Sequence, residues 1–138
     1  MEINLLAVVW CAVIAMVIGA IWYGPLFGKK WMQVIGVNHH DAEARKKMQR
    51  DALPLYALQF VLVLYQVFVL TDMTAGFGKA GIFNAFITWS AFIMPTIAAT
   101  AMWNNDSRKI AWTRFLIQSG YQLILFIIFG AILGFWIA

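Results

Sequence analysis

The stretch FLIQSGYQLILFIIFGAILGFWIA, from Phe115 to Ala138, contains 24 residues and no Asp, Glu, Lys or Arg. A helix that crosses the hydrocarbon core of a bilayer needs about 20 predominantly apolar residues. Three other uncharged runs reach that length, because residues 3–28, 52–71 and 80–105 contain 26, 20 and 26 residues. An open strand would leave its backbone groups unpaired in lipid, so each of the four runs predicts a transmembrane helix.

The composition indicates the same class of protein. Of the 138 residues, 63% are hydrophobic and 12% are charged, whereas soluble domains are about half apolar and about a quarter charged. The first run differs from a cleavable signal peptide, because Glu2 stands where basic charge is expected and the apolar stretch exceeds about 15 residues. We therefore predict an all-α integral membrane four-helix bundle, in which residues 1–138 form a single domain.

The basic residues are concentrated in two of the predicted loops. They are Lys29, Lys30, Arg45, Lys46, Lys47 and Arg50 between the first and second helices, and Arg108, Lys109 and Arg114 between the third and fourth. Loops that stay in the cytoplasm are the ones enriched in Lys and Arg. We therefore predict that both loops are cytoplasmic, that both termini are non-cytoplasmic, and that the membrane is the plasma (inner) membrane.

The first basic loop is long enough to contain structure of its own. Its second half, DAEARKKMQRDA from Asp41, is rich in helix formers and can be capped by Asn38 or Asp41. Just before it, Phe27, Trp31 and either Val34 or Ile35 recur at helical spacing. We therefore predict a short amphipathic cytoplasmic segment that lies in the membrane interface, with its cations near anionic headgroups.

Small residues predict how the helices pack. Ala7, Cys11, Ala15 and Gly19 follow one another at spacings of four in the first run, and Gly130 and Gly134 form a GxxxG pair in the last. Such stripes let neighbouring backbones approach closely, within one chain or between two chains. A bundle of this size has little interior, so we expect a homo-oligomer, most simply a symmetric dimer.

None of the four runs contains an ionisable Asp, Glu, Lys, Arg or His. Such residues within a membrane mark proton relays and ion-coupled transport, and a hydrolase needs a nucleophile beside a base. We therefore predict no enzyme activity and no catalytic residues. The chain resembles the small multidrug transporters in size and helix count, but their first helix carries an essential carboxylate and residues 3–28 contain none.

Uncharged polar side chains remain within the runs. The candidates for a polar intramembrane niche are Gln59, Gln118, Gln122, Asn84 and Thr88. Gln59 and Gln122 each lie eight residues from a charged helix boundary, so they share a depth and can hydrogen-bond across helices. Such bonds are worth about 0.6 kcal/mol on average, so one interpretation is structural. The other is a facilitative channel or transporter for a neutral solute.

Other site chemistries find little support. His39, His40, Asp41 and Glu43 suggest a metal, but only His39 and Glu43 would share a helix face, and two ligands are too few for zinc. The sequence contains no phosphate-binding glycine loop, CxxC pair or nucleic-acid motif. We therefore expect no metal, no cofactor and no nucleic-acid partner.

The segment WYGPLFGKKWM, from Trp22 to Met32, follows the small-residue first run. It resembles the signature of a family of small membrane proteins known as domain of unknown function 1761. The residues that carry the resemblance are Trp22, Tyr23, Pro25, Phe27, Gly28, Lys29 and Trp31, with Gly76, Gly81, Trp89, Pro95, Gly120, Tyr121, Gly130 and Trp136 further on. One departure is Gly24, where the family pattern leads us to expect a small polar residue such as Ser.

The resemblance implies a four-helix membrane fold and no established activity. The physical interpretation of the segment is that it ends the first helix. Pro25 would stop the helix, and Phe27 and Trp31 would anchor the chain among the headgroups. The functional interpretation is a lipid-headgroup site made by Tyr23, Lys29, Lys30 and Trp31. We therefore expect a non-enzymatic protein that binds membrane lipid or a small apolar molecule, or that supports another membrane component.

Overall fold

The computed structural model describes residues 4–77 and 81–137, and within these ranges it contains helices and turns but no strand. The elements are α1 (Leu5–Ile21), the π-helical turn η1 (Trp22–Leu26), α2 (Gly28–Ile35), α3 (Ala42–Phe77), α4 (Gly81–Thr88), the π-helical turn η2 (Trp89–Ile93), α5 (Met94–Trp103) and α6 (Arg108–Ile137). Four segments are long and apolar enough to cross a membrane: Leu5–Leu26, Ala42–Gly76, Gly81–Trp103 and Arg108–Phe135. The prediction of an all-α bundle with four transmembrane helices is confirmed.

The amphipathic stretch predicted from Asp41 is continuous with the second transmembrane helix. The carboxylate of Asp41 accepts hydrogen bonds from the backbone N–H groups of Glu43 and Ala44, which is the geometry of a helix N-cap. Asn38 instead accepts from the N–H of His40 within the preceding turn. The separate short helix of this loop is α2, which ends at Gly36, a residue in the left-handed conformation with φ of 79°.

Two prolines lie at π-helical turns. Pro25 was expected to stop the first helix, but the chain continues through η1 with Pro25 inside it, and the break comes at Phe27. Pro95 lies in the first turn of α5, directly after η2. A proline ring has no N–H and crowds the preceding turn, and a wider turn accommodates the ring without ending the helix.

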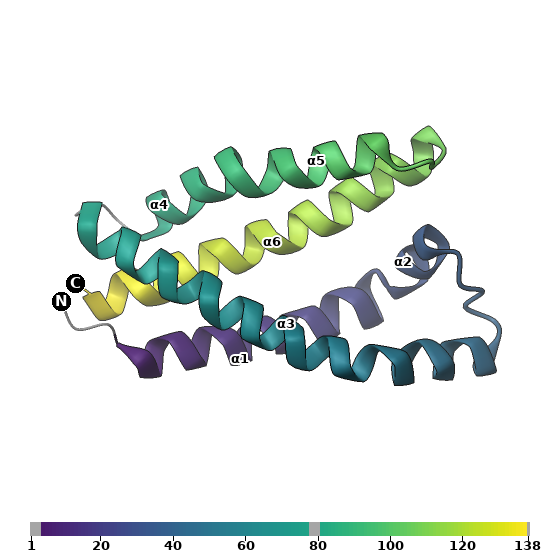
Figure 1. The fold of residues 1–138 in the computed structure, drawn as a ribbon, viewed down its shortest axis with the longest axis horizontal. Coiled ribbons are helices and arrows are strands. Elements are labelled where there is room, and N and C mark those ends of the chain that lie inside the picture. Colours follow the sequence, from purple (N-terminus) through teal and green to yellow (C-terminus); the bar gives the residue numbers. More distant parts are fainter. Residues whose placement is uncertain (1–3, 78–80, 138) are drawn as a thin grey trace.

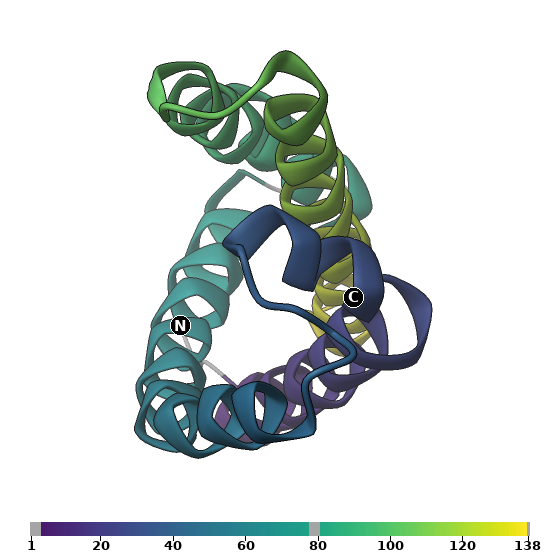
Figure 2. The same ribbon diagram turned by 90° about the vertical axis from the view of Figure 1, so that its right-hand side faces the viewer.

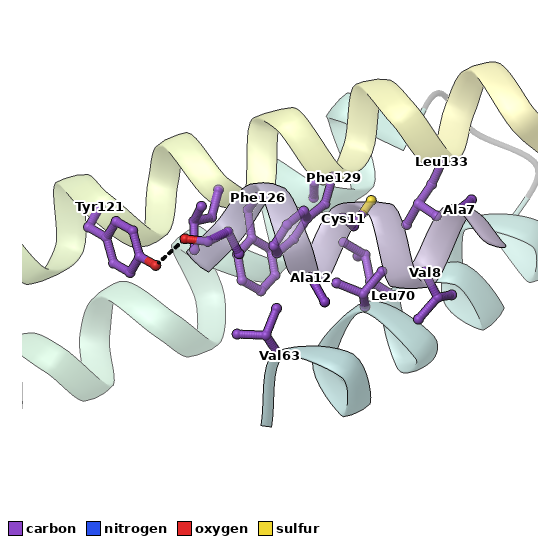
Figure 3. Close-up of a cluster of buried hydrophobic side chains, with 14 residues drawn as sticks. Ala7, Val8, Cys11, Ala12, Val63, Leu70, Tyr121, Phe126, Phe129 and Leu133 are labelled. Carbon is purple, nitrogen blue, oxygen red and sulfur yellow. Dashed lines mark hydrogen bonds between the residues drawn. The ribbon is translucent and has the colours of Figure 1, made fainter. Parts of the chain in front are cut away.

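The central helix is α6, which packs against α1, α2, α3, α4 and α5. Figure 1 shows α4 and α5 along one side of α6, with α1 and α3 on the other. The core between α1, α3 and α6 includes the fully buried side chains of Cys11, Val67, Phe129 and Leu133, and Figure 3 shows most of this cluster. The connections 36–41 and 104–107 lie at one end, which we call the basic end (Figure 1).

The opposite end, which we call the glycine end, is packed through backbone atoms. A Cβ atom at Gly81 of α4 would collide with the carbonyl oxygen of Gly130, and one at Gly130 would lie 2.6 Å from the carbonyl oxygen of Gly81. Gly134 also borders Gly81. The GxxxG pair is therefore used inside the chain, and the small-residue face of α1 is likewise buried at Ala7, Cys11 and Ala15.

Towards the basic end the helices separate. Val63, Val67 and Leu70 of α3 are buried, whereas all six residues from Leu53 to Leu58 are exposed. Figure 2, which views the molecule from the basic end, shows α3 and α5 on different sides with an opening between their ribbons. The closely packed helix pairs accordingly include α3 with α1 and α6 but not α3 with α5.

Candidate functional site

Trp22 attaches the end of the first transmembrane helix to α6. Its indole N–H donates to the carbonyl oxygen of Ile117 at 3.0 Å, and its ring lies 4.7 Å from that of Phe27. The ring covers Gly120, where a Cβ atom would lie 3.3 Å from the indole. Glycine at this position of α6 therefore makes room for the tryptophan.

A second tryptophan attaches the third transmembrane segment in the same way. Trp89 opens η2 as Trp22 opens η1, and its indole N–H donates to the carbonyl oxygen of Ser119 at 3.1 Å. Ile117 and Ser119 are two residues apart, so their carbonyls lie about 200° apart around α6. The two tryptophans thus hold α6 from opposite sides at nearly the same depth.

Tyr23 lies at the centre of an aromatic cluster formed by η1, α2 and α6. The centroid of its ring lies 4.9 Å from that of Trp31 and 5.3 Å from that of Tyr121, and both pairs have an edge-to-face arrangement. Tyr121 is itself fixed, because its hydroxyl donates to the carbonyl oxygen of Ala15 at 2.9 Å (Figure 3). A Cβ atom at Gly19 would lie 2.8 Å from that hydroxyl, so Gly19 makes room for Tyr121.

The short helix α2 is held against α6. Val34 is buried, and the guanidinium of Arg114 donates to the Val34 carbonyl oxygen at 3.4 Å and to the carboxylate of Asp106 at 3.0 Å. At the other end of α2, a Cβ atom at Gly28 would lie 3.1 Å from the carbonyl oxygen of Tyr23. These contacts fix the direction in which α2 presents its side chains.

Two lysines lie in the first turn of this anchored helix. Lys29 and Lys30 are both exposed, while Trp31 is half-buried against Tyr23. The structure therefore brings together Tyr23 and Trp31 of the four residues predicted for a lipid site. Within residues 4–77 and 81–137 neither lysine forms a salt bridge, so both ammonium groups can meet an anion.

The loop after α2 adds two histidines to this region. The rings of His39 and His40 lie 3.9 Å apart. Partial desolvation, together with the charges of His40, Lys29 and Arg45, lowers the pKa of His39 below its usual value of 6.5. His39 is therefore neutral near pH 7, and it lies within the electrostatic reach of cations from both α2 and α3.

The five residues of the predicted polar niche lie on three helices. Gln59 on α3 and Gln118 and Gln122 on α6 are half-buried, whereas Asn84 on α4 is buried and Thr88 donates to the Asn84 backbone carbonyl. Among residues 4–77 and 81–137, no hydrogen bond joins the side chains of any two of these five residues. Within the same ranges, the side-chain oxygen of Gln122 and the side-chain nitrogen of Asn84 are buried without a partner.

Metal-ligand types do not gather anywhere in the described part of the chain. No group of three or more His, Cys, Asp or Glu side chains that could hold a metal occurs within it. Asp41, one of the four residues considered for a metal, uses its carboxylate to cap α3.

Several contacts of this region could not be read from the sequence. Tyr121 and Arg114 complete the cluster from α6, about 90 residues after η1. For Tyr121 a signal existed, since Gly19 and Gly120 are small residues that make room for large rings. The hydrogen bond from Arg114 to a backbone carbonyl of α2 had no such signal in the sequence, because every residue type has a backbone carbonyl.

Comparison with known proteins gave one match. No curated protein and no solved structure matches the chain. A family model described as "Protein of unknown function (DUF1761)" matches residues 6–134, which is nearly the whole chain. The match includes the segment from Trp22 to Met32, on which the resemblance was based. The chain therefore belongs to the DUF1761 family.

Proposed function

We propose that this membrane protein binds the headgroup of an anionic phospholipid at the segment from Tyr23 to Trp31 and has no catalytic activity of its own. The observation that carries the proposal is the geometry of α2. One face of the helix is fixed through Val34 and Trp31, and the adjoining Lys29 and Lys30 are exposed. Two neighbouring cations on a fixed helix beside aromatic rings suit a phosphate at the level of the headgroups.

The surroundings favour a lipid over a soluble anion. Leu26, at the end of η1 and three residues before Lys29, is exposed. An acyl chain can lie against Leu26 while the phosphate of the same molecule meets Lys29 and Lys30. The same apolar surface would also suit a small apolar molecule, and binding of either kind is compatible with support of another membrane component.

The orientation of the chain is part of the proposal. The basic end carries nine of the ten Lys and Arg residues, so we infer that it faces the cytoplasm, with both termini on the other side of the plasma membrane. Anionic lipids are enriched in the cytoplasmic leaflet. The proposed site would therefore face the leaflet that contains its ligand.

Lipid retention tests the proposal. The protein is reconstituted in nanodiscs of mixed phosphatidylcholine and phosphatidylglycerol, and the retained lipid is identified by native mass spectrometry after gentle release. The double variant Lys29→Gln, Lys30→Gln should lose anionic lipid, because each lysine near the surface contributes about 1 kcal/mol. The two together correspond to about a thirty-fold loss of affinity.

The matched control removes the same charge from the same loop. Lys46 and Lys47 are also exposed, but they lie on α3 rather than beside the aromatic cluster. The double variant Lys46→Gln, Lys47→Gln should retain phosphatidylglycerol like the wild type. Equal losses in the two double variants would show that the loop attracts lipid only through its net charge, and no loss in either would exclude the site.

A second candidate function is facilitated passage of a neutral solute, and Gln122 favours it. Its buried amide oxygen has no partner within the described residues, and a buried polar group without a hydrogen bond is costly. A passing solute that donates a hydrogen bond would satisfy it. Under this hypothesis Gln59→Leu with Gln122→Leu abolishes flux of neutral solutes such as glycerol in liposomes, and unchanged flux would rule it out.

A further inference from the structure

Within the first half of α3, the turn from Leu53 to Leu58 is exposed on every side. Successive residues of a helix are rotated by about 100°, so the six exposed residues from Leu53 to Leu58 point in all directions around the axis. A helix packed against a neighbour buries a residue every three or four positions. The second half of α3 does so at Val63, Val67 and Leu70, whereas no residue between Ala42 and Leu62 is buried.

The protomer also has more surface than a compact chain of its size. Its accessible surface is 8990 Å² for a mass of 15.6 kDa. The size relation for compact folded monomers gives about 7,200 Å², so the excess is about 1,700 Å². A stable protein interface of standard size buries about 800 Å² on each partner. The excess is therefore more than enough to supply the contact area of a dimer.

A surface of small side chains lies on α5. Its exposed side chains include small residues that follow one another along the helix, at Pro95, Thr96, Ala99 and Thr100. The hydroxyls of Thr96 and Thr100 donate to the carbonyls of Phe92 and Thr96 in their own helix segment, so they require no outside acceptor. Small residues on a transmembrane helix allow a second helix to come close.

The two surfaces lie at the same depth. Leu55 comes four residues after Asp51 on α3, and Thr100 comes four residues before Asn104 at the end of α5. The helix α3 starts at the basic end and α5 ends there (Figure 1), so these residues lie at similar heights along the bundle. Within one chain α3 and α5 are not among the closely packed helix pairs, and Figure 2 shows their ribbons apart at the basic end.

We propose that a second copy of this chain covers these surfaces, with the first half of α3 in each copy packed against the small-residue face of α5 in the other. A two-fold axis along the membrane normal makes both contacts at once, so the assembly closes as a dimer. Large α3 side chains such as Leu55 and Tyr56 then fill the space above Ala99 and Thr100. This interface is separate from the proposed lipid site.

Crosslinking between two tagged forms tests the contact directly. One form carries Leu55→Cys and the other Thr100→Cys, both with Cys11→Ala, and the two are co-expressed and oxidised in the membrane. A crosslink that joins the two tags is expected. As a control, the Leu55 variant is replaced by Val17→Cys, which is also an exposed position, on α1. No crosslink, or as much in the control pair, would overturn the proposal.

A substitution on the exposed face of α5 separates loss of the dimer from loss of the fold. Ala99→Phe should raise the dimer dissociation constant at least ten-fold, because the larger ring occupies the space of the partner helix. Ala131→Phe makes the same change on the exposed side of α6 and should leave the dimer intact. Mass measurement in lipid nanodiscs gives the subunit number. A wild-type monomer covered by lipid alone, or a dimer unaffected by Ala99→Phe, would contradict the proposed interface.

Discussion

The glycine end and the basic end of the bundle are stabilised by different kinds of contact. At the glycine end, Gly81 and Gly130 bring two backbones into contact, and Phe129 and Leu133 are fully buried. At the basic end, the helices separate, and α6 is held through single hydrogen bonds from Trp22, Trp89 and Tyr121 to backbone carbonyls. Steric packing therefore dominates one end, and directional polar and aromatic contacts dominate the other.

The comparison has a functional consequence. Tightly packed backbones tolerate little change, because a single added methyl group displaces a whole helix. Contacts made by individual side chains can be changed one at a time. Substitutions at exposed positions such as Lys29 and Lys30 should therefore lower the stability of the fold only slightly. The basic end is thus the place where binding residues can be carried without loss of the bundle.

The largest expected effect is at the packed end. Phe129→Ala should lower the free energy of unfolding by about 3–5 kcal/mol, since a fully buried ring leaves a cavity. Phe92→Ala is the matched control, because Phe92 is exposed. Unfolding in bicelles, followed by steric trapping, measures both. Equal losses would mean that the core around Phe129 is not packed more tightly than the surface that faces lipid.

A smaller loss of stability is expected at the backbone contact between Gly81 and Gly130. Gly130→Ala should cost about 1–3 kcal/mol, because the new methyl group meets the backbone of Gly81 and cannot move aside without shifting α4. Gly76→Ala makes the same change where no atom lies within 4 Å of the new carbon, so it should be neutral or slightly stabilising. A neutral Gly130→Ala variant would show that α4 and α6 are further apart than described.

Composition and charge distribution predicted the packed end well. The four spans were predicted from uncharged runs alone, and the stripe of Ala7, Cys11 and Ala15 correctly marked a packing face. The partner of Gly130 could not be predicted, because a GxxxG pair indicates close approach without naming the second helix. Gly81 supplies it because α4 packs beside the end of α6, which is a tertiary contact.

The basic end was less predictable. The sequence placed Tyr23 and Trp31 in one candidate site, and their rings are in contact. Pro25 was expected to end the helix, but a π-helical turn carries the chain past it. Trp22, the first residue of that turn, donates to an acceptor on α6, which is a tertiary contact between residues 95 positions apart. Local sequence rules contain no information about such a contact.

An intermediate test concerns the tryptophan hydrogen bonds. Trp22→Phe keeps an aromatic ring against Phe27 and removes the donor to Ile117, so the free energy of unfolding should fall by about 0.6 kcal/mol, the average for a polar contact between transmembrane helices. Trp103→Phe changes a tryptophan that is 87% exposed and should have no measurable effect. If both variants are neutral, the aromatic packing alone holds the first helix against α6.

The last expected effect is on lipid binding rather than on stability, and it is a pH dependence at the basic end. Because the pKa of His39 is lowered from 6.5 by partial desolvation and by His40, Lys29 and Arg45, the ring is neutral at pH 7 and gains its charge only as the pH falls below 6.5. Protonation then adds a third cation near Lys29, so phosphatidylglycerol binding should strengthen by about two- to five-fold between pH 7.5 and pH 5. His39→Gln should reduce this increase, and His39→Lys should give the acid-state affinity already at pH 7.5. If the wild type and the His39→Gln variant have the same pH profile, the proton responsible lies elsewhere in the headgroup region. The charge of Lys29 acts on the His39 ring, so a phosphate oxygen that approaches Lys29 from the α2 side must also come within reach of the charge on His39.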